Sequence, residues 1–395
     1  MKLPRPKKSP LRKHWSLDPR VVFLNHGSFG ACPKEVLRHQ AELRQRMENE
    51  PLQFLWRNHD SMIHEARVSL ARFLGVKTTD LVFTTNATNA VNAVVRSWPL
   101  KRGDEILTTN FDYNACRNVL AEAADKAGAK VVVAEIPFPI RSADVVVERV
   151  LSAVTPRTRF AMLDHVTSNT ALVMPVARIA KELEPRGVRV LIDGAHAPGM
   201  LPLNPSKLHA SWYTGNLHKW VCAPKGAAFL RAREDSRELL QPAVISHGNN
   251  SRRDGFEAWQ DRFDWPGTFD STAWFSVPKA IETIGSILPG GWPEVREQNR
   301  ALVLSAREML CEALEVEAPC PASMIGSMAT IPLPARFQKA VQTGRIAPEY
   351  VRLFEEYGIE VPFVKIGGLR CFRISAHLHN SPEEYVYLAE AIKRL

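Results

Sequence analysis

The order of apolar runs in residues 20–278 constrains the fold most strongly, because short strand-like runs alternate with amphipathic helical segments. Strands are predicted at 20–25, 81–85, 105–109, 130–134, 160–165 and 189–193. Helices are predicted at 33–50, 61–73, 89–95, 115–127 and 177–184. This alternation is typical of an α/β fold, in which a mostly parallel sheet is covered by helices on both faces.

The pattern changes after Pro278. Helices are predicted at about 279–287 and 293–314, followed by a strand–helix–strand pattern near Met328, Tyr350 and Leu369 and a last helix at 383–395. We therefore expect a large domain at 20–278 and a smaller α+β domain at 279–395. Residues 1–19 are basic and rich in proline, which predicts a mobile tail.

Composition excludes several classes of protein. The chain has 395 residues, of which 45% are hydrophobic, so it can bury the cores of two domains. No apolar run has membrane-spanning length, and the N-terminus lacks the apolar stretch of a secretory signal. The six cysteines form no C-x-x-C pair, which indicates reduced thiols in a cytoplasmic protein and no zinc site. The net charge of +9 accompanies no nucleic-acid-binding module, so we expect it to attract small anionic ligands.

Polar side chains follow several of the predicted strands. Thr88, Tyr113, His165 and Asp193 all fall just beyond strand ends, and α/β sheets bind ligands at the carboxyl ends of their strands. Each residue has a simpler interpretation when taken alone. The segment 86–88 suits an ordinary helix N-cap as well as a phosphate site. The tyrosine could be a rim or core aromatic, and the histidine a structural residue. Their common position predicts that they converge.

Asp193 and Lys219 give the most specific chemical signal. The run 188–193 ends in the aspartate, Gly-Ala-His196 follows, and the lysine lies in the next predicted loop, 211–220. A lone lysine there would usually be a surface charge, and a lone aspartate a turn former. Together they are what an enzyme dependent on pyridoxal 5'-phosphate (PLP) needs. Lysine supplies the Schiff base, and aspartate keeps the pyridine nitrogen protonated so that the ring accepts electrons.

The run 369–377 contains two arginines, and the apolar residues around Arg373 predict that this one is buried. A buried guanidinium needs an anionic partner. Either a structural salt bridge or the carboxylate of a bound substrate would provide it.

These motifs together resemble the class V aminotransferase superfamily of fold-type I PLP enzymes. The resemblance rests on Asp193-Gly-Ala-His196, Gly215-Asn-Leu-His-Lys219, Asn86-Ala-Thr88 and Arg373-Ile-Ser. Segments 24–30, 50–57 and 267–270 resemble its isopenicillin N epimerase-like branch. The resemblance extends over about residues 20–395. It implies a large PLP-binding domain with a mostly parallel sheet of the seven-stranded type, and a small C-terminal α+β domain.

The resemblance also implies roles for individual residues. Lys219 would form the Schiff base and act as acid and base, Asp193 would pair with the pyridine nitrogen, and Arg373 would hold the substrate carboxylate. Thr268 would reach the phosphate of a neighbouring subunit, which implies a homodimer with a shared active site. The other cofactor-binding residues would be Ala87, Thr88, Tyr113, His165, His196, Asn216 and His218. The substrate mouth would be lined by Asn25, His26 and Arg57.

Departures from the branch leave the substrate open. His26 stands where threonine is common, Ala171 where glycine is frequent, and His379 where tyrosine is common. The loop 358–368 lacks the nucleophilic cysteine of cysteine desulfurases, so persulfide chemistry is not expected.

The implied reaction occurs at the Cα of an amino acid or a derivative of one. Epimerisation and C–S lysis rank ahead of transamination. Two other classes remain as alternatives: a PLP-binding regulatory subunit without activity, and a nucleotide-binding α/β domain. The second lacks the G-x-G-x-x-G and Walker loops that it would need.

Overall fold

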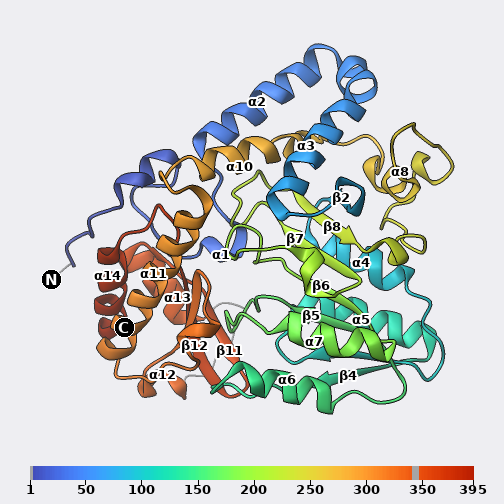
Figure 1. Cartoon of the computed structure of the whole chain (residues 1–395). Helices are drawn as coiled ribbons and strands as arrows, with labels where there is room; N and C mark the ends of the chain where they lie inside the picture. The colour runs from blue at the N-terminus through green and yellow to red at the C-terminus, as the bar shows by residue number, and fades with distance from the viewer. Residues whose placement is uncertain (1–2, 340–346) are drawn as a thin grey trace.

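The computed structural model describes residues 3–339 and 347–395 (Figure 1). The strands are β1 (Val22–Phe23), β2 (Leu81–Thr84), β3 (Glu105–Thr109), β4 (Lys130–Ala134), β5 (Thr158–Asp164), β6 (Arg189–Asp193), β7 (Trp212–Asn216), β8 (Ala228–Ala232), β9 (Met328–Pro332), β10 (Ile359–Glu360), β11 (Phe363–Ile366) and β12 (Leu369–Ser375). The α-helices are α1 (His26–Phe29), α2 (Lys34–Asn49), α3 (His59–Leu74), α4 (Ala87–Ser97), α5 (Asn114–Ala127), α6 (Ala143–Ser152), α7 (Val176–Leu183), α8 (Ala258–Asp264), α9 (Thr272–Phe275), α10 (Val277–Gly285), α11 (Gly291–Ala313), α12 (Ala335–Gln338), α13 (Pro348–Tyr357) and α14 (Pro382–Arg394).

A seven-stranded sheet in the order β2-β8-β7-β6-β5-β3-β4 forms the centre of the molecule. Strands β7, β6, β5, β3 and β4 pair in parallel, whereas β8 is antiparallel to both β7 and β2. Every residue of β2, β3, β7 and β8 is buried, as expected for strands covered on both faces. The α/β class and the mostly parallel sheet are therefore confirmed.

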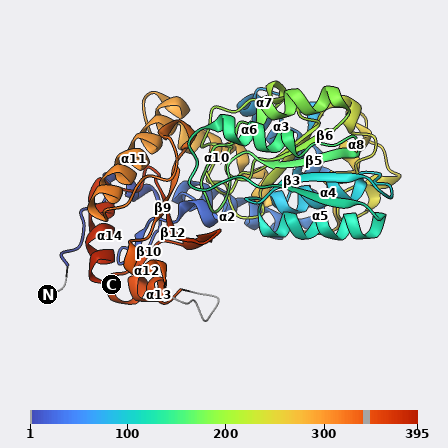
Figure 2. The same ribbon diagram turned by 90° about the horizontal axis from the view of Figure 1, so that it is seen from below.

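Helices cover both faces of this sheet, as the view in Figure 2 shows. Helices α4 and α5 contact one face, and their apolar residues share a core cluster with Val82, Ile106 and Leu191. Helices α6 and α7 contact the other face, where Phe83, Leu107 and Ile192 belong to the largest core cluster. Neighbouring residues of one strand thus enter different cores, which is the two-residue periodicity of a β-strand.

The C-terminal part of the chain builds a second, antiparallel sheet of order β11-β12-β9. Helix α11 contacts β9 and α14. The short strand β1 belongs with this part of the molecule, because it pairs in parallel with β10. The predicted domain limits at residues 20 and 278 stay a prediction, but the first strand of the predicted large domain lies beside the C-terminal part.

The prediction of a mobile N-terminal tail is wrong for residues 3–19, and residues 1–2 lie outside the described range. Trp15 is 3% exposed, and its Nε1 donates to the Ala31 carbonyl at 3.1 Å. Ser9 Oγ donates to the carbonyl of Leu378 at 2.7 Å, and Arg5 Nη1 to that of Tyr357 at 2.8 Å. These partners lie far along the chain, so no local sequence pattern predicts the contacts.

Sequence patterns missed β7 and β8 of the central sheet and the covering helix α6, together with the shorter elements α1, α8, α9, α12, β10 and β11. Strand β7 occupies part of the predicted loop 211–220 that carries the lysine. Between residues 3 and 339 and between 347 and 395, no helix combines the length and apolar character needed to span a bilayer.

Candidate active site

A cavity of about 380 Å³ opens at the carboxyl ends of the parallel strands. It is lined by Ser28, Phe29, Thr85, Asn86, Ala87, Thr88, Tyr113, Asp164, Val166, Ser168, Asp193, Ala195, His196, Asn216, His218, Lys219, Lys225 and Gly226. Most of the residues predicted to bind a cofactor are in this set, so the structure brings together what the sequence scatters. Asp164 and Lys225 are additions that sequence analysis missed.

The backbone around Lys219 is fixed by a close approach to α1. The chain leaves β7, turns, and returns through a hydrogen bond from Leu217 N to the Ala227 carbonyl. Gly30 packs against this turn with φ of 70°. A Cβ atom at Gly30 would lie 2.0 Å from the His218 carbonyl oxygen and 2.9 Å from Lys219 Cα. The glycine that closes the Gly-Ser-Phe-Gly segment is therefore required by contact as well as by conformation.

The Lys219 amine points to His196, with 3.1 Å between Nζ and Nε2. Burial, helped by the nearby Arg373 cation, lowers the pKa of Lys219 to about 7, against an opposing effect of Asp193 and Asp164. Burial also lowers the pKa of His196 well below its ordinary value. A substantial fraction of the amine is thus unprotonated near neutral pH, which is the form that attacks a carbonyl group.

Asp193 ends β6 and presents its carboxyl to the floor of the cavity. Its Oδ1 accepts from Ala195 N at 2.9 Å, and its Oδ2 from Cys116 Sγ at 3.4 Å. Burial raises its pKa, which the Ala195 and Cys116 donors and Lys219 oppose. No arginine or lysine forms an ion pair with Asp193 in the described part of the chain. A bound cation at this position would satisfy the buried carboxylate.

The N-terminus of α4 faces the same cavity. Asn86 is the N-cap, and its Oδ1 accepts from Asn89 N at 2.8 Å, so the ordinary-cap interpretation is confirmed. Ala87 N donates to Asn216 Oδ1 at 2.9 Å, which ties the helix to the end of β7. The cap leaves Thr88 at the cavity wall. The Thr88 hydroxyl and the positive end of the α4 dipole, at one place, form a site suited to an anion such as phosphate.

Tyr113 stands at the cavity rim as the N-cap of α5 and is 50% exposed. It is one of few large apolar or aromatic side chains with so much exposed surface. An exposed aromatic face beside a cavity can stack on a planar ring.

Arg373 on β12 is 3% exposed and holds residues that line the cavity. Its Nη1 donates to the Ser168 carbonyl at 2.6 Å, and its Nη2 to Ser28 Oγ at 3.0 Å and to Asn25 Oδ1 at 3.3 Å. Its Nε has no partner, and no carboxylate pairs with it among the described residues. Arg370, on the same strand, pairs instead with Glu349 at 3.0 Å. The structural salt bridge considered for Arg373 is thus absent from the described chain.

His26 does not line the cavity, and its predicted contact with substrate stays a prediction. The side chain is 0% exposed and lies behind Lys219, whose carbonyl is 3.0 Å from His26 Nε2. A carbonyl only accepts, so Nε2 donates and Nδ1 accepts from His379 Nε2 at 3.2 Å. Cys222 and His377 complete this buried group. The His26 and His377 rings are stacked at 4.3 Å. The hydrogen bond to Lys219 occupies the nitrogen that would otherwise ligate a metal.

Four further predicted residues lie outside the cavity wall. His165 is next to it, but its Nδ1 is 2.9 Å from the Tyr213 hydroxyl, and burial lowers its pKa to about 4. Asn25 supports Arg373 from behind. Arg57 is exposed and contacts Gln53, while Thr268 is exposed on a different segment. The roles predicted for these residues stay predictions.

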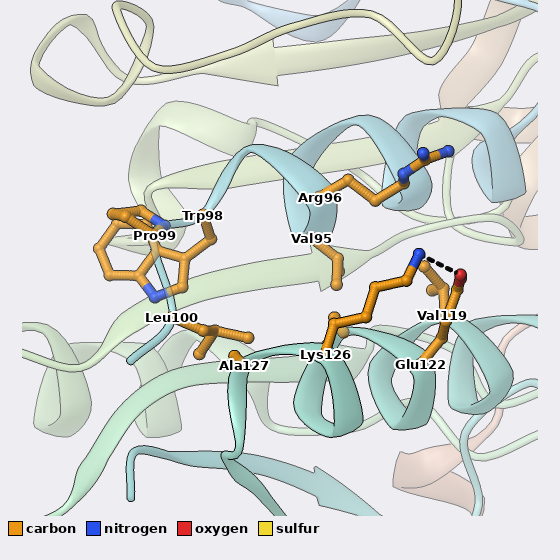
Figure 3. Close-up of a pocket in the computed structure, with 10 residues that line it drawn as sticks. Val95, Arg96, Trp98, Pro99, Leu100, Val119, Glu122, Lys126 and Ala127 are labelled. Carbon is orange, nitrogen blue, oxygen red and sulfur yellow. Dashed lines mark hydrogen bonds and ion pairs between the residues drawn. The ribbon is translucent and has the colours of Figure 1, made fainter. Parts of the chain in front are cut away.

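A separate cavity of about 410 Å³ lies between α4 and α5, on the outer side of the sheet (Figure 3). Val95, Leu100 and Val119 contribute apolar surface to it. Lys126, the cation on its α5 side, pairs with Glu122 at 2.6 Å. None of the residues predicted to bind cofactor or substrate lines this hollow, so we assign no chemistry to it.

Comparison with known proteins places this geometry in context. The aminotransferase class-V family matches residues 30–376. An isopenicillin N epimerase of Amycolatopsis lactamdurans is 34% identical over 399 residues, covering 97% of each chain. A probable chloroplastic L-cysteine desulfhydrase of Arabidopsis thaliana is 28% identical and covers 96% of this chain and 83% of its own.

Solved structures show the same fold. The apo cysteine desulfurase of Thermococcus onnurineus NA1 aligns with a TM-score of 0.79 at 21% identity, over 100% of both chains. The cystine C–S lyase C-DES aligns with a TM-score of 0.76 at 21% identity, over 95% of this chain and 97% of that one.

Proposed function

Because the chain belongs to the aminotransferase class-V family, we propose that it is a PLP-dependent enzyme acting at the Cα of an amino acid or amino-acid derivative. The observation that carries the proposal is the joint placement of Lys219 and Asp193 in one cavity. One supplies a partly unprotonated buried amine, and the other a buried carboxyl that forms no ion pair with the residues that the structure describes. Relatives named as epimerases and desulfhydrases favour epimerisation or C–S lysis.

The residues present fit the cofactor. Asp193 offers a buried carboxyl for the pyridinium nitrogen, Tyr113 an aromatic face, and the α4 N-terminus with Thr88 an anion site. PLP is a planar ring that carries a cation at one end and a phosphate at the other, so each chemical feature has a complementary group. When bound, the ring serves as the electron sink that stabilises a carbanion at Cα.

The chain's own residues would handle binding and protons. Lys219 would hold the cofactor covalently and, once released, take or return the Cα proton at Nζ. His196 lies within hydrogen-bond distance of Nζ and would orient the amine. Arg373 would bind the substrate carboxylate in place of its present neutral partners, since a charged bidentate contact is stronger than bonds to hydroxyl and carbonyl groups.

Epimerisation and C–S lysis need proton donors at different places in the cavity. Epimerisation needs a second proton donor on the face opposite Lys219, whereas lysis needs a donor for the departing sulfur. The class V aminotransferase and the inactive PLP-binding subunit remain the alternatives. The family and the retained lysine, aspartate and arginine weigh against the inactive subunit.

Incubation of the holoprotein with candidate amino acids in deuterated water tests the proposal. Cα exchange with inversion identifies an epimerase, pyruvate with released sulfur a lyase, and an amine form of the cofactor a transaminase. Lys219→Ala should abolish both the visible absorption of bound PLP and the exchange. A wild-type protein that remains colourless after addition of PLP would refute the proposal.

The finer expectations belong to the same proposal. A homodimer is supported by large exposed apolar side chains near the cavity mouth or on the neighbouring π-helical turn 53–57, including Phe29 at 73% and Trp56 at 75% exposure. In such a dimer Thr268 of one copy would reach the cofactor phosphate site of the other, as the resemblance implies. A cytoplasmic location agrees with the free cysteines of the described chain.

A further inference from the structure

Asp164 is a buried carboxyl that the proposed function has not yet used. It occupies the last position of β5, is 4% exposed and lines the cavity. Its Oδ1 is buried and has no hydrogen-bond partner among the described residues. The backbone N–H of Tyr113 only slightly offsets the effects that raise the pKa of this carboxyl. Leaving a charged carboxylate oxygen buried without a donor is costly, whereas a neutral carboxylic acid bears this environment better.

Two other carboxyls lie close to Asp164 and are better supplied with donors. Asp193 is its register partner on the neighbouring parallel strand, so the two side chains leave the same face of the sheet. Asp193 receives the bonds from Ala195 and Cys116 described above. Asp112, just after β3, accepts from the Thr109 backbone N–H and hydroxyl at 3.3 and 2.7 Å. Asp164 is thus the member of the group with the poorest support for a negative charge.

Electrostatics agree with this ranking. Burial first, and then Asp112 and Asp193, raise the pKa of Asp164 well above its ordinary value, while Lys219 opposes them. Burial raises the pKa of Asp112 to about 7. Like charges at such distances disfavour simultaneous ionisation. Lys219 is the nearby cation that favours ionisation of Asp164 and Asp193. Among Asp112, Asp164 and Asp193, a proton is therefore held most readily by Asp164.

We propose that Asp164 is a second acid of the cofactor site, which stays protonated and donates a hydrogen bond to an acceptor atom of the bound pyridine ring system. This inference rests on the proposed function. Asp193 then supplies the one negative charge that matches the ring nitrogen, and Asp164 adds a hydrogen bond without a second charge.

Asparagine and alanine at position 164 test the assignment by PLP titration of the apoprotein. Asp164→Asn keeps the shape, the neutrality and an N–H donor, so its PLP dissociation constant should stay within about threefold of wild type. Asp164→Ala removes the donor and should weaken PLP binding by roughly tenfold or more, the effect of one bond to a buried group. The pH at which the visible spectrum of bound PLP changes should be the same in Asn and wild type.

Other outcomes overturn the inference. Equal weakening in Asn and Ala would mean that Asp164 acts as an anion, and unchanged binding in both would mean that it does not touch the cofactor. Asp164→Leu fills the volume without a donor and replaces Ala if that variant does not fold. Asp112→Asn is the matched control, because it neutralises a buried neighbour that does not line the cavity. Failure of wild type to bind PLP would refute the proposed function instead.

Discussion

Gly30→Ala should disrupt both the stability of the protein and the position of its Schiff-base lysine. Gly30 has φ of 70° and ψ of 164°, a region that is essentially restricted to glycine and costs other residues about 1–3 kcal/mol. The added Cβ would also lie 2.0 Å from the His218 carbonyl oxygen, so the turn that carries Lys219 must move. Forcing an extra carbon into a packed site costs about 1–3 kcal/mol more. We expect a total loss of roughly 2–6 kcal/mol from a domain stability of about 5–15 kcal/mol.

Urea unfolding of the apoprotein measures this loss, and PLP titration measures the displacement of Lys219. Gly103→Ala is the matched control: Gly103 also has positive φ, at 86°, but a Cβ there would meet nothing within 4 Å. It should lose only the conformational part, about 1 kcal/mol, and bind PLP normally. Equal stabilities for the two variants, with PLP binding retained in Gly30→Ala, would refute the close-approach argument.

Arg373→Ala should weaken binding of an unreactive amino-acid analogue by about 1.5–3 kcal/mol, measured by spectral titration, and an unchanged affinity would contradict its role. The unfolding free energy of the apoprotein should rise from about pH 7 to pH 10.5, since only the unfolded state keeps the Lys219 proton in that window. Lys219→Met should remove this part of the pH dependence; identical profiles would show that the amine is not buried. Trp15→Ala should destabilise by about 3–5 kcal/mol and expose the tail to protease, whereas a tail that is cut equally in wild type would contradict its packing.

The sequence predicted the chemistry of the site better than it predicted which residues line the cavity. Asp193 and Lys219 could be paired because strand ends of a parallel sheet meet at one edge. Sequence analysis singled out His165 and missed Asp164, the residue immediately before it. In the structure Asp164, and not His165, lines the cavity. A register argument could have found it, because an aspartate that ends β5 must lie beside the one that ends β6.

Long-range packing explains the remaining errors. The buried packing of His26 and of the tail was not predicted, because their partners, among them Lys219 and Leu378, lie far away in the chain. Neither the periodicity nor the composition of the N-terminal segment predicts such contacts. Strand β8 follows β7 without an intervening helix and runs antiparallel to it, so this pair departs from the strand–helix alternation on which the prediction relied.

The pairing of β1 with β10 has a consequence for the order in which this protein can mature. Residues 22–30 leave the ribosome before the central sheet is synthesised, whereas their partners at 359–360 and Arg373 emerge only after it. The apolar side chains of this segment therefore stay exposed to solvent while the central sheet forms. Contacts between such distant residues close slowly. We therefore expect the turn that carries Lys219 to become rigid, and the protein to become able to bind its cofactor, only after residues 359–373 have been synthesised and packed.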